Sequence, residues 1–385
     1  MMSRERVLFV DHTGQIGGAE LILLDVVQGR KDSSAFLFEQ GPLAKAMAER
    51  GLPVIISRWG QGLANFRRDS SWLKALPLFG RLAAITAELA RTARAHDVVY
   101  ANSQKAFVLS AIANLVARRP LIWHLHDIIS SAHFGAPQRR MQVGLANRFA
   151  TKVIVPSEAA AAAFIEAGGL RSLVEVVPNG LAVEPVSASR QELRQRLGLP
   201  SGPLVGVFSR LAQWKGQHVL IEALAKLPDV HGIIVGDALF GEQDYAARLT
   251  RLVADLGLRD RVHFLGHRND VPLLMQTVDA MVHPSIDPEP FGRTLVEAML
   301  AGVPVIATDA GAAPDILEHG RAGLLVPPGD ARALAEALDA VLAEPEILAP
   351  QLDYASRRAR THYSLARMLD SIGLLIRNVH TGAAV

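Results

Sequence analysis

The stretch DPEPFGRTLVE, residues 287–297, sets two glutamates eight positions apart where a buried strand is predicted to pass into a helix. The preceding residues 279–283 form a short apolar run, as buried strands of parallel sheets do. Gly302 marks the end of a helix that begins at Thr294. Two prolines in the connecting loop predict that Glu289 is carried into solvent. The stretch therefore indicates one strand–loop–helix unit whose loop holds a charged site.

The residue types in this unit suit a phosphorylated ligand. Gly292 allows the backbone to approach a ligand closely. The helix start behind it offers unpaired N–H groups and the positive end of the helix dipole, both of which suit a phosphate. Glu297 lies about one turn into the helix. Its carboxylate is ill suited to phosphate but suits the paired hydroxyls of a ribose.

Apolar runs of strand length alternate with helical patterns along the whole chain, which predicts βαβ units and parallel sheets. The predicted strands are 7–10, 34–38, 54–57, 98–101, 121–124, 153–155, 204–209, 232–236, 262–265, 280–283, 303–307 and 323–326. A turn-rich stretch near Pro178–Pro185 interrupts the series and argues against a single barrel. We therefore predict an α/β chain of two doubly wound domains, residues 1–180 and 181–362.

The tail from Asp353 onward is predicted to be helical. Tyr363, Leu365, Met368 and Leu375 lie at helical spacing in it. One alternative is that this tail simply packs on the second domain.

Charged and polar side chains follow five of the predicted strands. Ligands of open parallel sheets bind outside the carboxyl ends of the strands, so we expect these groups to gather at one site. They are Gly14–Gly18, His126, Arg210, the pair His267 and Arg268, and Glu289.

Arg210 and Lys215 suit a diphosphate, because one is a planar fork of donors and the other a mobile point charge. As bare residues they could equally be solvated surface cations. Paired cations would stabilise the negative charge of a leaving diphosphate and could replace a metal. No Asp-x-Asp pair follows a predicted strand, since Asp11 and Asp127 are isolated in the sequence, so we expect transfer without a metal ion.

His124 and His126 are two positions apart at a predicted strand end and are expected to point to the same side. They could be polar groups bonded to the backbone, or His126 could contact a substrate. A zinc site is not expected, since no third ligand is suggested nearby. Gly17 and Gly18 could approach a ligand or only form a tight turn. Asn102 and Ser103 follow the predicted strand 98–101. We assign them to the side of the site that faces a second substrate, the acceptor of a transferred group.

Composition narrows the class of protein. The 385 residues include no cysteine, which fits a reducing compartment. The N-terminus has no apolar signal region, and no apolar run approaches the ~20 residues that span a bilayer. We therefore expect a cytoplasmic protein, with peripheral contact to the inner face of the membrane as an open alternative.

Charge is uneven between the two halves. Residues 1–180 hold 21 Lys and Arg against 14 Asp and Glu, and the remainder holds 19 against 24. This difference is either ordinary scatter or a means of attracting an anionic acceptor or an anionic membrane. The basic pairs with nearby aromatics that could rest on lipid are Arg67 and Arg68 with Phe66 and Trp72, and Arg139 and Arg140 with Phe134. No nucleic-acid module is recognisable.

Taken together, these motifs resemble the retaining glycosyltransferases of family 4. The resemblance rests on the 287–297 stretch with its continuation AMLAGVPVIAT, on Gly14–Glu20, on His126 and Asp127, on residues 177–180, and on SRL at 209–211 with Lys215 and Gly216. It covers nearly the whole chain. One departure is the run GAAPD at 311–315, where the family often has two glycines and a glutamate.

The resemblance implies the GT-B fold, two Rossmann-like domains that face each other across a cleft, with a final helix of about residues 363–385 crossing back onto the first domain. It implies that the first domain serves the acceptor and the second binds the nucleotide sugar. It also implies that Glu289 contacts donor-sugar hydroxyls and Glu297 the ribose. At the diphosphate of the donor we expect Arg210, Lys215, Gly292 and Arg293. Near the base we expect His267 and Arg268. Contacts to the donor or to the acceptor are expected from His126, Gly17 and Gly18.

The sequence thus predicts a retaining hexosyltransferase that moves a sugar from a UDP- or GDP-type donor to a hydroxyl of a glycan, a lipid-linked saccharide or a small metabolite, as in polysaccharide biosynthesis. No cofactor is expected beyond this donor substrate. Two alternatives stay open: a phosphorylase or hydrolase that uses the same sugar-phosphate site, and a non-catalytic subunit that binds nucleotide sugar. Sequence patterns name neither the sugar nor the acceptor.

Overall fold

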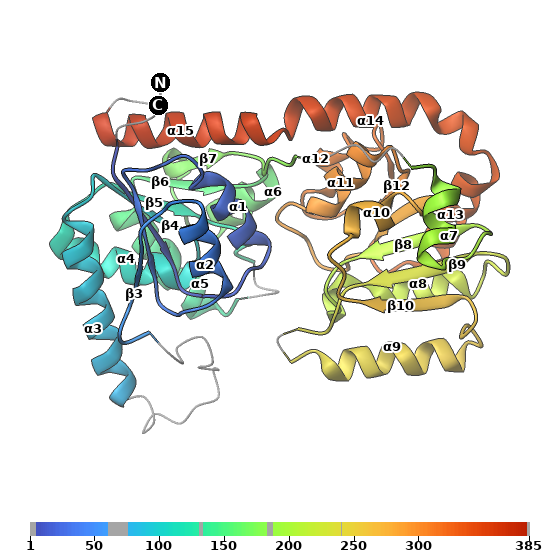
Figure 1. Ribbon diagram of the computed structural model, residues 1–385, viewed down its shortest axis with the longest axis horizontal. Coiled ribbons are helices and arrows are strands. Elements are labelled where there is room, and N and C mark those ends of the chain that lie inside the picture. The colour runs from blue at the N-terminus through green and yellow to red at the C-terminus, as the bar shows by residue number, and fades with distance from the viewer. Residues whose placement is uncertain (1–4, 61–75, 131–133, 183–187, 240, 383–385) are drawn as a thin grey trace. The chain divides into compact units, whose positions relative to one another are not determined.

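The computed structural model describes residues 5–60, 76–130, 134–182, 188–239 and 241–382 (Figure 1). The chain divides into two compact units. The first combines Met1–Gly180 with Leu365–Val385, and the second is Leu181–Ser364. Each unit is a parallel sheet with helices packed on both faces.

The first unit holds a seven-stranded sheet in the order β3-β2-β1-β4-β5-β6-β7, in which every neighbouring pair is parallel. The strands are β1 (Val7–Asp11), β2 (Ser34–Leu37), β3 (Val54–Ile56), β4 (Val98–Ala101), β5 (Leu121–His124), β6 (Lys152–Val155) and β7 (Val174–Val176). The helices are α1 (Gly18–Val26), α2 (Pro42–Glu49), α3 (Leu76–Ala93), α4 (Gln104–Ala117), α5 (Ala136–Phe149), α6 (Glu158–Glu166), η2 (Arg171–Leu173, a 3₁₀ turn) and α15 (Leu365–Thr381).

The strand order reverses between β1 and β4. From β1 the chain builds outward to β2 and β3, and then returns to add β4 on the other side of β1. Strands β1, β4 and β5 are buried along their full length, as their apolar sequences predict. Strand β7 was missed by the sequence patterns because it has only three residues and Glu175 stands at its centre.

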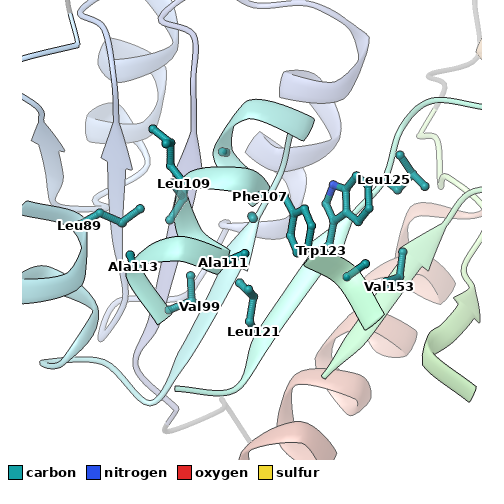
Figure 2. Close-up of a cluster of buried hydrophobic side chains, with 14 of the residues drawn as sticks. Leu89, Val99, Phe107, Leu109, Ala111, Ala113, Leu121, Trp123, Leu125 and Val153 are labelled. Carbon is teal, nitrogen blue, oxygen red and sulfur yellow. The ribbon is translucent and has the colours of Figure 1, made fainter. Parts of the chain in front are cut away.

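One face of this sheet packs against α3, α4, α5 and α6. Phe107 of α4 stacks on Trp123 of β5, with the ring centroids 4.2 Å apart and the planes 6° from parallel. Figure 2 shows this pair surrounded by aliphatic side chains such as Val99 and Leu121. An aromatic stack buried in this way contributes large apolar area from both side chains.

Helix α15 packs on the opposite face of the same sheet, beside α1 (Figure 1). Its buried residues Met368, Ile372 and Leu375 join the core that α1 and α2 form with β1. The C-terminal segment from Leu365 therefore belongs to the first unit and not to the second.

The tail is also not one helix. Helix α14 (Ala349–His362) ends before Tyr363, and α15 begins at Leu365. Tyr363 packs against Phe291 in the core of the second unit, with ring centroids 5.7 Å apart. The regular apolar spacing therefore combined residues from two helices that pack in two different cores. Such spacing indicates that residues are buried, but it does not indicate in which core.

The second unit holds a six-stranded sheet in the order β10-β9-β8-β11-β12-β13, again parallel throughout. The strands are β8 (Leu204–Phe208), β9 (His231–Val235), β10 (Val262–Gly266), β11 (Ala280–His283), β12 (Val305–Thr308) and β13 (Leu324–Val326). The helices are α7 (Arg190–Leu197), η3 (Gln213–Lys215), α8 (Gln217–Leu224), α9 (Gln243–Asp255), α10 (Val271–Met275), α11 (Arg293–Ala301), α12 (Ala313–Ile316), α13 (Ala331–Ala343), η4 (Pro345–Leu348) and α14.

The helices of the second unit also pack on both faces of their sheet. Helices α10, α11, α12 and α14 pack on one face, and α8, α9 and α13 pack on the other. The strand order reverses between β8 and β11, which are direct neighbours. None of the described helices is both long enough and apolar enough to span a membrane.

We predict that Trp123→Ala lowers the free energy of unfolding by about 3–5 kcal/mol, because it opens a cavity beside Phe107 that the rigid sheet cannot fill. Urea denaturation followed by circular dichroism measures the change. Leu115→Ala, at a side chain on α4 that is 59% exposed, is the control and should change stability by less than about 0.5 kcal/mol. Equal effects of the two substitutions would contradict the prediction.

Candidate functional site

In the second unit, the loops that follow β8 and β11 meet at the carboxyl end of the sheet, where the strand order reverses. The loop after β8 contains Arg210, Trp214 and Lys215, and the loop after β11 contains Glu289. Open parallel sheets bind ligands at such a reversal, because the adjacent loops leave in opposite directions there. The sheet topology therefore brings together two of the segments that the sequence singled out.

The two loops are interlocked through their backbones. The N–H of Ile286 donates to the carbonyl of Trp214 at 2.8 Å. Gly216 has a φ of +70°, and a Cβ added to it would lie 1.9 Å from the carbonyl oxygen of Pro284. Only glycine fits at this position, for both conformational and steric reasons. The contact fixes the position of Lys215 relative to the loop that carries Glu289.

Glu289 is buried, with 7% of its surface exposed, so the sequence-based expectation that its loop carries it into solvent is wrong. Its Oε1 atom accepts from Lys215 Nζ at 2.5 Å and from the hydroxyl of Ser285, and it lies 2.9 Å from His283 Nε2. These three donors hold the carboxylate in the interior although a proline stands on either side of it. Burial of a carboxylate requires such compensation.

The charge state of Glu289 follows from this environment. Burial opposes ionisation, but the nearby charges of His283 and Lys215 and their hydrogen bonds outweigh it, so the pKa of Glu289 lies well below its ordinary value. Glu289 is therefore a carboxylate at neutral pH. It can accept hydrogen bonds from hydroxyl groups, but it does not carry a proton to donate.

A third loop, after β12, holds Glu289 from its backbone. The carbonyl of Glu289 accepts from the N–H of Ala312 at 3.0 Å. Gly311 has a φ of +61°, and a Cβ there would lie 2.4 Å from the backbone N and O of Glu289. The run 311–315, which departs from the pattern of the resembled family, thus keeps the glycine that the Glu289 loop requires.

Two cations lie over the indole of Trp214. Lys215 Nζ is 4.3 Å from the ring centroid, and the guanidinium carbon of Arg210 is 5.3 Å from it. The amide of Gln217, which is fully buried, donates to the carbonyl of Arg210 at 2.9 Å and so fixes the backbone of this loop. Arg210 and Lys215 therefore both lie within cation–π distance of the same indole ring.

Helix α11 begins directly after this loop. Its N-cap is Gly292, which has a φ of +82°. Nη2 of Arg293 lies 3.6 Å from Oε1 of Glu297, one turn further along, while Arg293 Nη1 is buried with no hydrogen-bond partner. Burial raises the pKa of Glu297, and Arg293 offsets this only in part. An unsatisfied buried donor at a helix N-terminus is consistent with an anion site.

His267 and Arg268 follow β10, which is at the edge of the sheet and two strands away from β8. His267 is exposed, and Arg268 forms an ion pair with Asp270, with Nη2 and Oδ2 2.6 Å apart. Among the described residues, no hydrogen bond or ion pair joins either side chain to Lys215 or Glu289.

In the first unit, polar side chains gather at the reversal between β1 and β4. Asp11 at the end of β1 is fully buried and accepts from the Asn102 amide at 2.7 Å and from the backbone N–H of His12 at 2.6 Å. Sequence patterns did not indicate these partners of Asp11, because Asn102 lies 91 positions away along the chain. Nδ1 of His12 also lies 2.8 Å from the hydroxyl of Ser103, which caps α4.

His126 belongs to the same cluster, because its Nε2 lies 2.9 Å from Oδ1 of Asn102. Its ring is close to that of His124, with centroids 3.9 Å apart, and His124 is in turn bonded to the hydroxyl of Tyr100. Burial lowers the pKa of His126 to about 4, although Asp11 favours the charged form. His126 is therefore neutral at physiological pH.

Gly17 and Gly18 open α1 and are exposed. The N–H of Gly17 already donates to the carboxylate of Glu20 at 2.8 Å, whereas a Cβ on Gly18 would meet no atom within 4 Å. Gly14 has a different role, because a Cβ there would lie 2.5 Å from the carbonyl oxygen of Gln40. This earlier glycine is required by packing between two loops.

Sequence patterns did not single out several residues of these clusters. His283 and Ser285 hold Glu289, Asp11 holds Asn102, and Gln217 holds the loop of Arg210. Their common signal is a polar residue at the end of an apolar strand or the start of a helix, and this signal is too frequent to select them. Among the described residues, no three His, Asp or Glu side chains form a group that could hold a metal ion.

Comparison with known proteins identifies the family. The model for glycosyl transferases group 1 matches residues 189–361, and the model for a glycosyl transferase 4-like domain matches residues 40–180. The chain belongs to this family, the retaining glycosyltransferases of family 4, and it has the GT-B fold.

Particular relatives are known in structure and in sequence. The chain is 40% identical to HepE of Anabaena, whose structure was solved with UDP-glucose, with a TM-score of 0.87 over 97% of this chain and 100% of that one. It is 34% identical to a 2-deoxystreptamine glucosyltransferase of Streptomyces kanamyceticus, over 47% of this chain and 48% of that protein. It is 35% identical to a GDP-mannose-dependent phosphatidylinositol monomannoside mannosyltransferase of Mycobacterium tuberculosis, over 46% and 48%. The chain thus spans about half the length of these two curated relatives.

We predict that Gly311→Ala displaces the backbone of Glu289 and lowers catalytic turnover at least tenfold, about the effect of losing one well-placed hydrogen bond. Steady-state assays of sugar transfer, with thermal unfolding beside them, measure both effects. Gly329→Ala is the matched control, because Gly329 has a similar φ of +75° but open space around a Cβ. Both variants should lose about 1–2 kcal/mol of stability from the left-handed backbone. A Gly311→Ala enzyme as active as the Gly329→Ala enzyme would exclude this role of Gly311.

Proposed function

We propose that the protein is a retaining glucosyltransferase that takes glucose from UDP-glucose and transfers it to a hydroxyl group of a glycan, a lipid-linked saccharide or a small metabolite. The observation that carries this proposal is the buried, ionised Glu289 held beside Lys215 at the strand-order reversal of the second unit. An anionic acceptor of hydrogen bonds next to a cation suits a ligand that combines sugar hydroxyls with a diphosphate.

The choice of UDP-glucose rests on the relatives. HepE, which is similar over nearly the whole chain, was solved with UDP-glucose, and the Streptomyces relative is named a glucosyltransferase. The Mycobacterium relative is named as GDP-mannose-dependent, and its similarity spans less than half of this chain. GDP-mannose is therefore the alternative donor.

Cations of the second unit would stabilise the departing diphosphate. The ammonium of Lys215 has three N–H donors, and one of them serves Glu289, so two remain for phosphate oxygens. Arg293 would supply its unsatisfied Nη1, and the first N–H groups of α11 would supply the helix dipole. Arg210 completes the set beside Trp214. These groups act most strongly as the glycosidic bond breaks, because negative charge grows on the leaving group.

Glu289 would orient the sugar. Its Oε1 is occupied by three donors, which leaves Oε2 to accept from hydroxyl groups of the donor ring. Glu297 would accept from the ribose hydroxyls one helical turn into α11. We assign the first unit to the acceptor side. Gly17 and Gly18 are exposed there at the start of α1 and would approach the donor or the acceptor. His126 would contact a sugar of the donor or of the acceptor. His267 and Arg268 would lie near the base.

One observation favours a hydrolase or phosphorylase as a second candidate. The pKa of Glu289 is lowered and that of Glu297 is raised, and glycosidases use two carboxyl groups shifted apart in this way. An argument against this candidate is the position of Glu297 in α11, one turn after Arg293 near the helix N-terminus. This position suits a nucleotide better than a leaving sugar. Formation of sugar phosphate from a glycoside and free phosphate, without nucleotide, would support this candidate.

We also propose that the basic surface of the first unit contacts an anionic membrane. Arg140 on α5 is exposed and Phe134 is partly exposed, so this part of the basic surface is accessible. Residues Phe66, Arg67, Arg68 and Trp72 lie outside the described residues. Sedimentation with vesicles containing anionic lipid, and with neutral vesicles as the reference, measures the contact.

We predict that Glu289→Gln lowers the rate of glucose transfer at least 10²-fold relative to wild type. A neutral amide no longer forms an ion pair with Lys215 and no longer holds the donor ring. Glu289→Ala and Lys215→Ala are poorer tests of this role. Either one leaves a buried charge without its partner and is expected to cost about 3–5 kcal/mol of stability. Release of UDP and the anomer of the product, followed by NMR, measure rate and retention.

The control for this substitution is Glu336→Gln on α13, which removes an exposed i,i+4 ion pair with Arg332 and should leave transfer unchanged. A fully active Glu289→Gln enzyme would refute the assignment. Binding of UDP-glucose by the wild-type protein without turnover, with any acceptor or with water, would indicate a non-catalytic subunit instead.

We predict that UDP-glucose raises the melting temperature more than GDP-mannose or ADP-glucose does at equal concentration. Ligand binding to the folded state adds about 1.4 kcal/mol for each tenfold excess over Kd, so the preferred donor is distinguishable. Differential scanning fluorimetry across the three donors measures the order. UDP alone separates the contribution of the nucleotide from that of the sugar. A larger shift with GDP-mannose would overturn the choice of donor but not the family.

A further inference from the structure

Asp11 occupies a place in the first unit that the proposed chemistry does not explain. It is a fully buried carboxyl group at the end of β1. Its Oδ1 accepts from the backbone N–H of His12 at 2.6 Å and lies 3.1 Å from Nδ1 of the same histidine, and its Oδ2 accepts from Nδ2 of Asn102 at 2.7 Å. Both of its oxygens therefore act as acceptors.

This arrangement fixes the orientation of the Asn102 amide. Nδ2 of Asn102 faces Oδ2 of Asp11 and lies 3.4 Å from the carbonyl oxygen of Ala19, and both of these atoms accept. Turning the amide over would place its oxygen against two acceptors, so the reverse orientation is excluded. Oδ1 of Asn102 must then point toward His126, with Nε2 of the histidine 2.9 Å away.

The orientation of Asn102 in turn determines which nitrogen of His126 carries the proton. A carbonyl oxygen only accepts, so Nε2 of His126 must be the N–H donor. In a neutral imidazole the other nitrogen, Nδ1, is then an acceptor. The lowered pKa of His126 keeps the ring neutral at physiological pH. No hydrogen bond to Nδ1 is found among the described residues.

We infer that Asp11 and Asn102 are positioning residues that hold His126 in the tautomer protonated on Nε2, so that Nδ1 accepts a hydrogen bond from a hydroxyl of the bound sugar. The tautomer follows from the first unit alone, whereas its use toward a sugar rests on the proposed function. A fixed acceptor discriminates between donors by the position of a hydroxyl group, because a sugar without that hydroxyl cannot make this hydrogen bond.

Asp11→Asn is the substitution that reverses the chain of hydrogen bonds. The backbone N–H of His12 requires an acceptor, so the oxygen of the new side chain must face it, and its NH₂ group then faces Asn102. Asn102 has to turn over to accept from it, which directs the Asn102 NH₂ group at His126. His126 must then accept at Nε2 and carry its proton on Nδ1.

The double variant with Asp11→Asn and Asn102→Asp restores the original tautomer. The NH₂ group of residue 11 donates to one oxygen of the new carboxylate, and its other oxygen accepts from Nε2–H of His126. A purely structural role for Asp11 predicts no such restoration, because two buried positions are then altered at once.

NMR of protein labelled with ¹⁵N-histidine reads the tautomer directly, from the couplings of each ring nitrogen to the ring carbon-bound protons. His126→Gln identifies the His126 signals by their loss. We expect proton on Nε2 in the wild type, on Nδ1 in Asp11→Asn, and on Nε2 again in the double variant. Ser34→Ala is the control, since it removes a buried hydrogen bond to His96 at the other end of the sheet and should leave the tautomer of His126 unchanged.

Activity provides a second readout. With UDP-glucose, kcat should fall about tenfold or more in Asp11→Asn and recover in the double variant, which corresponds to one hydrogen bond lost and regained. A proton on Nδ1 in the wild type, or an unchanged tautomer in folded Asp11→Asn, would overturn the inference. If Asp11→Asn does not fold, Asn102→Ala replaces it, and a single Nε2–H tautomer in that variant would equally overturn it. An inactive wild-type protein with the expected tautomers would refute the proposed function and leave the positioning role intact.

Discussion

The charge of Glu289 is the constraint on which the arrangement of the second unit depends. A carboxylate removed from water is tolerated only where donors replace the lost hydration. Lys215, His283 and Ser285 supply those donors to one oxygen. The loops that bring them there must approach one another so closely that glycine is required at Gly216 and Gly311. The glycines, the cation and the carboxylate therefore form one interdependent structure.

The first unit meets the same constraint with different residues. Asp11 is buried where the strand order of its sheet reverses, as Glu289 is buried where the order of the other sheet reverses. Its neighbours are the Asn102 amide, the backbone N–H of His12 and Nδ1 of His12, which lies 3.1 Å from Oδ1 of Asp11. The consequence differs accordingly. In the second unit the buried carboxylate is joined to a cation that suits phosphate. In the first unit the buried carboxyl group orders a chain of hydrogen bonds that ends at a neutral histidine.

Much of the fold could be predicted from local patterns, because each buried strand is a short apolar run bounded by turns. Strand β7 escaped for the same reason, since three residues with Glu175 in the middle leave no run to detect. The tail was placed in one helix because Tyr363 and Met368 are both buried, yet they belong to different cores. Of the site, Lys215 and Glu289 were predictable as charged groups after strands. Their direct contact, and the inward turn of Glu289, were not.

The sequence by itself determined the class of the fold, the family and the charged residues at the strand ends, because these depend on composition and spacing over short stretches. Only the tertiary structure decided the state of those residues. His283 lies close to Glu289 along the chain, but Lys215 is 74 positions away, and Asp11 and Asn102 are 91 apart. Protonation, tautomer and burial depend on distances between groups that the chain brings together only when its parallel strands are paired. That is why the sequence pattern allowed an exposed Glu289, whereas the folded protein buries it.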